Sequence, residues 1–325
     1  MDLMSDDIDQ STGEPAIAYV GKTPWHGLGK ELPVGQPIEK WLKAARLDWE
    51  LTRLPVQYLV DGTHRTMEDR FVLARSDTRE ALSIVSGDYQ IVQPGAVLEF
   101  YRDLMKDYGY TLETAGALDH GRKVWALART GVTEAADERG DDKIAAYVLL
   151  ATSCDKTLAT TAAFTSIRVV CQNTLFFATE EVRKKGHPQV KVPHNFYFDA
   201  ALVKAQLGLM NPAWKAFLGK VRKMTAYRME PDAASSFFNA LLARKDKPLS
   251  RTAEREQQTI TALFRSGPGQ ELASAKGTLW GAVNAVTYYT DHVRSGAEER
   301  LDGAWFGSGY ALKEKAWTQA SALVG

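Results

Sequence analysis

The sequence is short of several features, and each shortage excludes a class of protein. Only two of its 325 residues are cysteines, Cys154 and Cys171, so we expect no disulfide framework like that of small secreted domains. No apolar run approaches the roughly 20 residues of a membrane-spanning helix, and no leader of the secretory type is present. These absences predict a cytoplasmic protein that does not associate with membranes and keeps both thiols reduced.

Motifs typical of enzymes are also scarce. Neither Cys-x-x-Cys nor His-Glu-x-x-His occurs among the six histidines and two cysteines, and Gly-x-Ser-x-Gly is absent. Cys154 lies two residues from Lys156, whose charge would lower the pKa of the thiol, but a small buried cysteine is the commoner outcome. Acidic pairs such as Glu68-Asp69 are typical of solvated turns. We therefore expect no metal, no cofactor and no catalytic residue.

The chain has no net charge, because 40 Lys and Arg balance 40 Asp and Glu. This balance excludes a uniformly basic nucleic-acid binder, but it conceals local asymmetry. Residues 1–14 carry five acids and no base, a net charge of −5. Residues 167–229 carry eleven bases and three acids, a net charge of +8. The sequence thus has an acidic start and a basic middle.

Hydrophobic periodicity predicts strands first and helices later. The strand signals lie at residues 54–60, 70–74, 111–118, 123–130, 144–152 and 157–171. The helix signals lie at residues 37–47, 95–108, 172–185, 199–224, 231–243, 254–266, 277–294 and 304–324. This order predicts an α+β fold, an antiparallel β-meander with flanking helices followed by a largely helical C-terminal half.

The same pattern predicts how the chain is divided. We expect a disordered acidic leader over residues 1–15, because large apolar residues are scarce there. A β-rich core over residues 16–176 follows, and then a mainly helical region over residues 177–325. The sequence leaves open whether the two parts form one domain.

Basic and aromatic residues alternate in the basic middle, a pattern typical of proteins that bind single-stranded nucleic acid. Ordinary amphipathic helices give the same pattern, with aromatic residues inward and lysines outward. The candidate phosphate contacts are Arg168, Arg183, Lys184, Lys185, Lys191, Lys220, Arg222 and Lys223. Tyr197 or Phe196 would stack on bases. Arg168 lies inside an apolar run and therefore needs a partner, either a carboxylate such as Asp155 or a phosphate.

Several stretches together resemble a known family. They are GKTPWHGLGKEL, GDYQIVQP, KVWALART, SCDKTLA and SIRVVCQNTL. The chain resembles, over about residues 18–300, the phage- and plasmid-encoded proteins grouped as domain of unknown function nine-three-two. The family motifs include Trp25, His26, Ser153, Asp155, Arg168, Cys171 and Asn173. Ser-Cys-Asp-Lys departs from the more usual Ser-x-Asp-Gly at Lys156.

The family carries no established activity, but the resemblance implies a mobile element in a bacterial host. At the level of fold, the expected meander with helices is also similar to phage single-strand annealing proteins of the RecT and Red-beta type. We therefore expect a non-enzymatic, homo-oligomeric protein that binds single-stranded DNA and promotes annealing in recombination or replication. Two alternatives stay open. One is a protein-interaction module that inhibits a host defence factor, and the other is a metal-dependent nucleic-acid enzyme.

Overall fold

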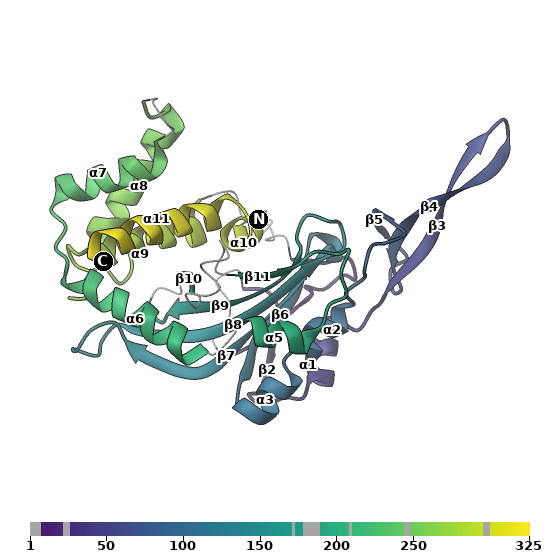
Figure 1. Cartoon of the computed structure of the whole chain (residues 1–325), viewed down its shortest axis with the longest axis horizontal. Coiled ribbons are helices and arrows are strands. Elements are labelled where there is room, and N and C mark those ends of the chain that lie inside the picture. The colour runs from purple at the N-terminus through teal and green to yellow at the C-terminus, as the bar shows by residue number, and fades with distance from the viewer. Residues whose placement is uncertain are drawn as a thin grey trace. The chain divides into compact units, whose positions relative to one another are not determined.

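The computed structural model describes residues 8–21, 27–170, 173–177, 189–207, 210–243, 248–294 and 300–325 (Figure 1). It confirms the predicted α+β fold, with the helices concentrated in the C-terminal half. The bounds of the described helices are α1 (Ile38–Ala44), α2 (Pro94–Glu99), α3 (Arg102–Tyr108), α5 (Ala200–Leu207), α6 (Met210–Ala226), α7 (Pro231–Leu242), α8 (Arg251–Ser266), α9 (Leu279–Tyr288), α10 (Arg300–Trp305) and α11 (Ser308–Val324). A 3₁₀ turn, η1 (Asp119–Gly121), and a π-helical turn, η2 (Tyr289–Val293), complete the helical elements described.

The larger sheet is mixed. Its order is β10-β9-β8-β7-β6-β1-β2, and β11 pairs with β9. The bounds are β1 (Ile17–Val20), β2 (Lys30–Leu32), β6 (Thr111–Leu118), β7 (Lys123–Ala135), β8 (Lys143–Ser153), β9 (Thr160–Arg168), β10 (Asn173–Phe177) and β11 (Gln189–Val192). Strands β6 to β9 are neighbours in chain order, as a meander requires, whereas β1 and β2 pair in parallel. Strand β8 is buried from Ile144 to Ser153, which explains its unbroken apolar run.

The smaller sheet has the order β3-β4-β5 and is antiparallel. Its strands are β3 (Leu51–Val60), β4 (Thr63–Arg75) and β5 (Ala81–Ser86). Asp61 and Gly62 join β3 to β4, and both have positive φ, 49° and 76°. A two-residue hairpin turn needs this conformation, and Asp-Gly is one of the pairs that adopt it most readily. Residues 54–60 and 70–74, which the sequence predicted as strands, lie within β3 and β4.

Two compact units divide the chain, and they interleave along the sequence. Unit 1 comprises residues 1–131, 147–164 and 182–208, and unit 2 comprises residues 132–146, 165–181 and 209–325. Strands β7, β8 and β9 each contribute residues to both units. The compact units therefore do not follow the expected change of element type near residue 176.

The start of unit 1 differs from the expected disordered leader. Among residues 8–15, which the structure describes, Ile8 pairs with Leu118 and Asp9 is only 3% exposed. Asp9 accepts a hydrogen bond at 2.5 Å from Arg75, which is fully buried and also binds Asp77. For residues 8–15 the structure differs from the expectation because Asp9 is a counter-ion that the buried Arg75 requires, which the acidic composition concealed.

Candidate nucleic-acid interface

Arg168, at the end of β9, lies in the core of unit 2 and is 2% exposed. Its Nε donates to Asp142 Oδ1 at 2.6 Å, and its Nη2 donates to Asp142 Oδ2 at 2.8 Å and to the Gly269 carbonyl at 2.9 Å. The expectation that Arg168 contacts a phosphate is wrong, because a carboxylate already fills the guanidinium fork away from solvent. The partner is Asp142 and not Asp155, whose side chain instead binds Thr157.

Asp142 is the centre of a buried network. Besides Arg168, it accepts hydrogen bonds from Ser274 Oγ at 2.7 Å and from Trp280 Nε1 at 3.0 Å. Gly269 has φ +76°, and a Cβ there would lie 2.8 Å from Arg168 Nη1. A glycine is therefore needed for both its conformation and its close approach. The network satisfies two opposite charges inside the core.

The continuation of the SIRVVCQNTL motif also faces the core. Asn173 opens strand β10, where the sequence predicted a helix, and its Nδ2 donates to Asn284 O at 3.0 Å. The Thr174 amide and hydroxyl donate to Asp291 Oδ2, and Lys313 Nζ donates to Asp291 Oδ1 at 2.6 Å. These bonds tie β10 to α9, η2 and α11. The described part of this motif thus builds the core of unit 2.

A loop in unit 1, residues 193–198 after β11, presents the aromatic side chains predicted to stack on bases. Phe196 is 62% exposed and Tyr197 is 84% exposed. His194 holds this loop in place, since its ring stacks on Tyr89 with centroids 4.6 Å apart. The ring nitrogens of His194 lie 3.0 Å from Leu158 O and 3.2 Å from Gln90 O. We call residues 193–198 the aromatic loop.

A tight turn between β8 and β9 lies next to the aromatic loop in unit 1, since its Leu158 carbonyl contacts His194. Ser153 Oγ donates to Leu158 O and accepts from Leu158 N, both at 3.0 Å. Asp155 accepts from the Thr157 amide and hydroxyl, which closes the turn. Lys156 has φ 70° and is exposed. The family residues Ser153 and Asp155 therefore shape the turn that presents Lys156.

A pocket of about 310 Å³ lies between this turn and the aromatic loop. Its lining residues are Ser86, Asp88, Tyr89, Lys156, Ala159, Pro193, His194 and Asn195. A hydrogen bond from Ser86 lowers the pKa of Asp88, so Asp88 is ionised at neutral pH beside the Lys156 ammonium. The pocket therefore carries one charge of each sign, and the exposed Tyr197 lies two residues after Asn195 of its lining.

The remaining predicted basic contacts fall into three groups. Arg183, Lys184 and Lys185 lie outside the described residues, as do Trp25, His26 and Cys171. Lys191 on β11 is exposed. Lys220, Arg222 and Lys223 lie on α6 in unit 2, where Arg222 pairs with Glu134 at 3.3 Å and Lys223 donates to Gly325 O at 3.0 Å.

Helix α6 has the arrangement of an ordinary amphipathic helix. Trp214 and Phe217 are buried, whereas Arg222 and Lys223 are exposed. Trp214 is 2% exposed, and its ring already stacks on Phe217 with centroids 5.6 Å apart, so it cannot serve as a stacking surface for bases. The alternative interpretation of the basic and aromatic pattern therefore holds for α6.

Sequence reasoning missed the residues that position the aromatic loop. Tyr89 is 5% exposed, its hydroxyl donates to Ser153 O at 2.9 Å, and burial raises its pKa. His194 lies 104 residues from Gln90 in the chain, so no local spacing could have indicated their contact. The sequence did contain one indication of Tyr89, because this residue is the tyrosine of GDYQIVQP, one of the stretches that carry the family resemblance.

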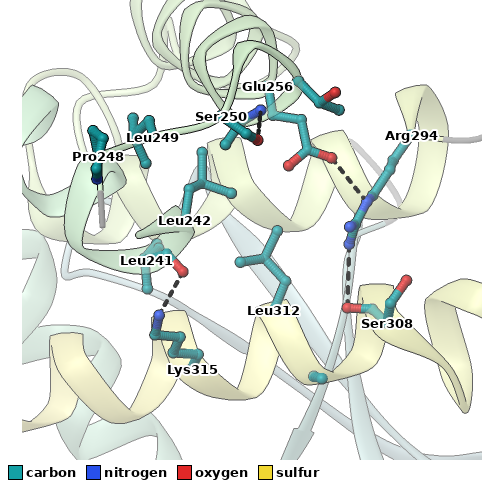
Figure 2. A pocket seen from close by; sticks show the side chains of 13 residues that line it. Leu241, Leu242, Pro248, Leu249, Ser250, Glu256, Arg294, Ser308, Leu312 and Lys315 are labelled. Atoms are coloured by element: carbon teal, nitrogen blue, oxygen red, sulfur yellow. Dashed lines mark hydrogen bonds and ion pairs between the residues drawn. The ribbon is translucent and has the colours of Figure 1, made fainter. Parts of the chain in front are cut away.

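Unit 2 contains a second cavity, of about 650 Å³ (Figure 2). Apolar side chains such as Leu242, Leu249 and Leu312 form much of its wall. Its charged groups bind one another or the backbone: Arg294 contacts Glu256 at 3.3 Å, and Lys315 Nζ donates to the carbonyls of Ala240 and Leu241 near the end of α7. These contacts hold α7, α8 and α11 around the cavity.

Within the residues that the structure describes, no group of three or more His, Cys, Asp or Glu side chains is placed to hold a metal ion. No helix in the same residues has both the length and the apolar character needed to cross a membrane.

Comparison with known proteins identifies the family. A family model described as a domain of unknown function (DUF932) matches residues 81–320. The chain belongs to this family. The predicted resemblance to this family is confirmed, although the GKTPWHGLGKEL stretch precedes the matched residues. No match was found among curated proteins or among solved structures.

The network around Asp142 generates a stability prediction. Replacing Asp142 with Ala leaves Arg168 buried without its counter-ion, so we expect the free energy of unfolding to fall by about 3–5 kcal/mol. Asp141→Ala is the matched control, because Asp141 is exposed and should change stability by less than about 0.5 kcal/mol. Urea unfolding followed by circular dichroism measures both. Equal effects of the two variants would contradict the central role of Asp142.

Cys154 generates a reactivity prediction. Burial raises the pKa of its thiol to about 12, and the thiolate is the reactive form. Iodoacetamide at about pH 8, where an ordinary thiol with a pKa of about 8.5 reacts, should leave Cys154 unmodified in the native protein and modify it after denaturation. Peptide mass mapping reads Cys154 separately from Cys171. Rapid native labelling of Cys154 would show that the thiol is accessible and ionised.

Proposed function

We propose that this DUF932 protein binds single-stranded DNA without catalysing a reaction and promotes annealing of complementary strands. Its setting would be a phage or plasmid recombination or replication system in the bacterial cytoplasm. The observation that carries the proposal is the aromatic loop. Exposed aromatic side chains on a fixed support provide surfaces on which bases of any sequence can stack.

The support for the loop matters as much as its exposure. A freely moving tyrosine would lose conformational entropy on binding, which opposes affinity. The backbone next to Phe196 and Tyr197 is held by His194, whose ring contacts Tyr89, Leu158 and Gln90. Stacking on Tyr197 therefore requires less ordering than stacking on an unanchored side chain.

Lys156, which lines the same pocket as residues 193–195, and basic residues that precede the aromatic loop in the chain would supply the phosphate contacts. Lys156 and Lys191 are exposed in unit 1, and Arg183, Lys184 and Lys185 precede Lys191 by six to eight residues in the sequence. Asp88 and Asp155 offset part of this charge locally. We therefore expect stacking to contribute a large share of the affinity, with phosphate contacts adding a moderate dependence on salt.

The stacking role of Tyr197 is tested by fluorescence anisotropy with a labelled single-stranded oligonucleotide and a duplex control. Tyr197→Ala should weaken binding about 5- to 150-fold, because one stacked base contributes about 1–3 kcal/mol. Tyr108→Ala is the matched control, since Tyr108 is a tyrosine of unit 1 that is 70% exposed but lies at the end of α3. It should leave affinity unchanged. Equal affinities of the two variants would exclude the aromatic loop as the platform.

Binding and annealing measurements on the wild-type protein test the proposed function directly. Salt-sensitive binding that favours the single strand supports the proposal, and acceleration of complementary-strand annealing extends it. The double variant Arg183→Ala, Lys184→Ala should lower the slope of log affinity against log salt by about 1.4. No binding at micromolar protein in low salt would overturn the proposal and favour the protein-interaction alternative.

A further inference from the structure

The pocket between the β8–β9 turn and the aromatic loop contains an acid to which the proposed function gives no role. Asp88 lines this pocket together with Lys156. A carboxylate beside a lysine that binds phosphate repels the phosphates and weakens the binding of any strand. The position of Asp88 therefore needs a reason of its own, and contact with another part of the nucleotide would supply one.

Both charges of the pocket are able to take a ligand. A hydrogen bond from Ser86 lowers the pKa of Asp88 most, and the positive charges of Arg70 and Lys156 also lower it. Asp88 and Lys156 thus interact through space, yet neither is in an ion pair with another residue that the structure describes. A carboxylate has about four lone-pair sites, so the hydrogen bond from Ser86 leaves most of them available.

The backbone that carries Asp88 is fixed before any ligand binds. Arg53 on β3 donates to the carbonyls on both sides of Asp88, to Gly87 at 3.3 Å and to Tyr89 at 2.5 Å. The Tyr89 amide donates to the Ser86 carbonyl at 3.2 Å and closes a turn. A ligand that binds the Asp88 carboxylate therefore has little backbone to order, which favours affinity.

The pocket has the size and the position to take one base of a strand. Its volume of about 310 Å³ lies at the lower end of the range of small-molecule sites, about 300–1,000 Å³. Its lining continues to Asn195, and Tyr197 follows two residues later. Two residues of chain span at most about 7 Å. A base stacked on Tyr197 consequently has its neighbours in the strand within reach of the pocket.

A carboxylate paired with a lysine distinguishes guanine from the other bases. Guanine presents two adjacent N–H donors, N1 and the 2-amino group, and these match the two oxygens of a carboxylate. Its O6 and N7 are acceptors, which suit a lysine. Adenine and cytosine each place an acceptor nitrogen beside the amino group, and thymine places a carbonyl on each side of its N–H. Those acceptors repel a carboxylate.

We propose that this pocket binds a guanine base of the single strand, with Asp88 accepting from N1 and the 2-amino group and Lys156 donating to O6 and N7. The inference rests on the proposed function, because a bound single strand delivers the base. Stacking on Tyr197 is indifferent to sequence, whereas the pocket adds a preference at one position of the strand. Contact with the base offsets the repulsion between Asp88 and the phosphates.

Competition measured by fluorescence anisotropy tests the choice of base. The competitors are thymine oligonucleotides of one length that carry guanine, adenine or hypoxanthine at every third position. The guanine strand should bind at least about fivefold more tightly than the adenine strand, the lower end for a bidentate base contact. Hypoxanthine keeps the N1 donor but lacks the 2-amino group, so its strand should bind with intermediate affinity. Equal binding of the hypoxanthine and guanine strands would overturn the assigned contact.

A charge-removing variant locates the preference. Asp88→Asn should abolish the preference for guanine and strengthen binding of the adenine strand, because a charge that repels phosphate is lost. Asp61→Asn is the matched control, since it removes the same charge at the hairpin turn, where Asn-Gly adopts the same conformation as Asp-Gly. It should leave the preference unchanged. Circular dichroism shows whether both variants keep the fold.

The outcomes separate this inference from the proposed function. Equal binding of the guanine and adenine strands, or a preference that persists in Asp88→Asn, would overturn the guanine pocket and leave the binding of single strands intact. Absence of binding by every strand would overturn both. A preference for guanine that Asp88→Asn removes and Asp61→Asn keeps supports the pocket.

Discussion

The buried pair of Arg168 and Asp142 is the constraint on which unit 2 depends. Removing two charges from water costs several kcal/mol for each ion, so the pair stabilises the fold only if its hydrogen bonds are complete. Ser274, Trp280 and the Gly269 carbonyl complete them. These groups come from the segment between α8 and α9 and from α9 itself, so the β-strands of unit 2 form their core together with the later helices.

Unit 1 also contains a buried arginine, whose charge is balanced by a different set of residues. Arg75 is fully buried, binds both Asp9 and Asp77, and lies over the Trp49 ring with its guanidinium carbon 4.3 Å from the ring centroid. Within the described residues, each unit thus contains a buried arginine with a carboxylate partner far away in the chain, Asp9 at 66 residues from Arg75 and Asp142 at 26 residues from Arg168. Both arginines that lie in apolar stretches have structural roles in a core. Lys156, Lys191 and Tyr197 differ from them because their side chains are exposed.

Local signals in the sequence were sufficient for the fold class and for individual elements. Asp61-Gly62 specifies its hairpin by its own conformational preference, and the strand signals at residues 111–118, 123–130 and 144–152 fall within β6, β7 and β8. The role of Arg168 could not be predicted in the same way. Its apolar surroundings correctly required a partner, but only the fold selects Asp142, 26 residues away, over Asp155 or a phosphate.

The interleaving of the two units has a consequence for synthesis on the ribosome. The last segment of unit 1 ends at residue 208, whereas Lys313, which binds Asp291 and Thr174 in unit 2, emerges more than a hundred residues later. At about 5–20 residues per second, the strand ends at Arg168 and Asn173 wait on the order of ten seconds for their helical partners. During that time they are exposed apolar strands with unpaired polar groups, which is the kind of segment that chaperones recognise. Slow elongation after residue 208 would therefore lower the yield of folded protein without changing any residue.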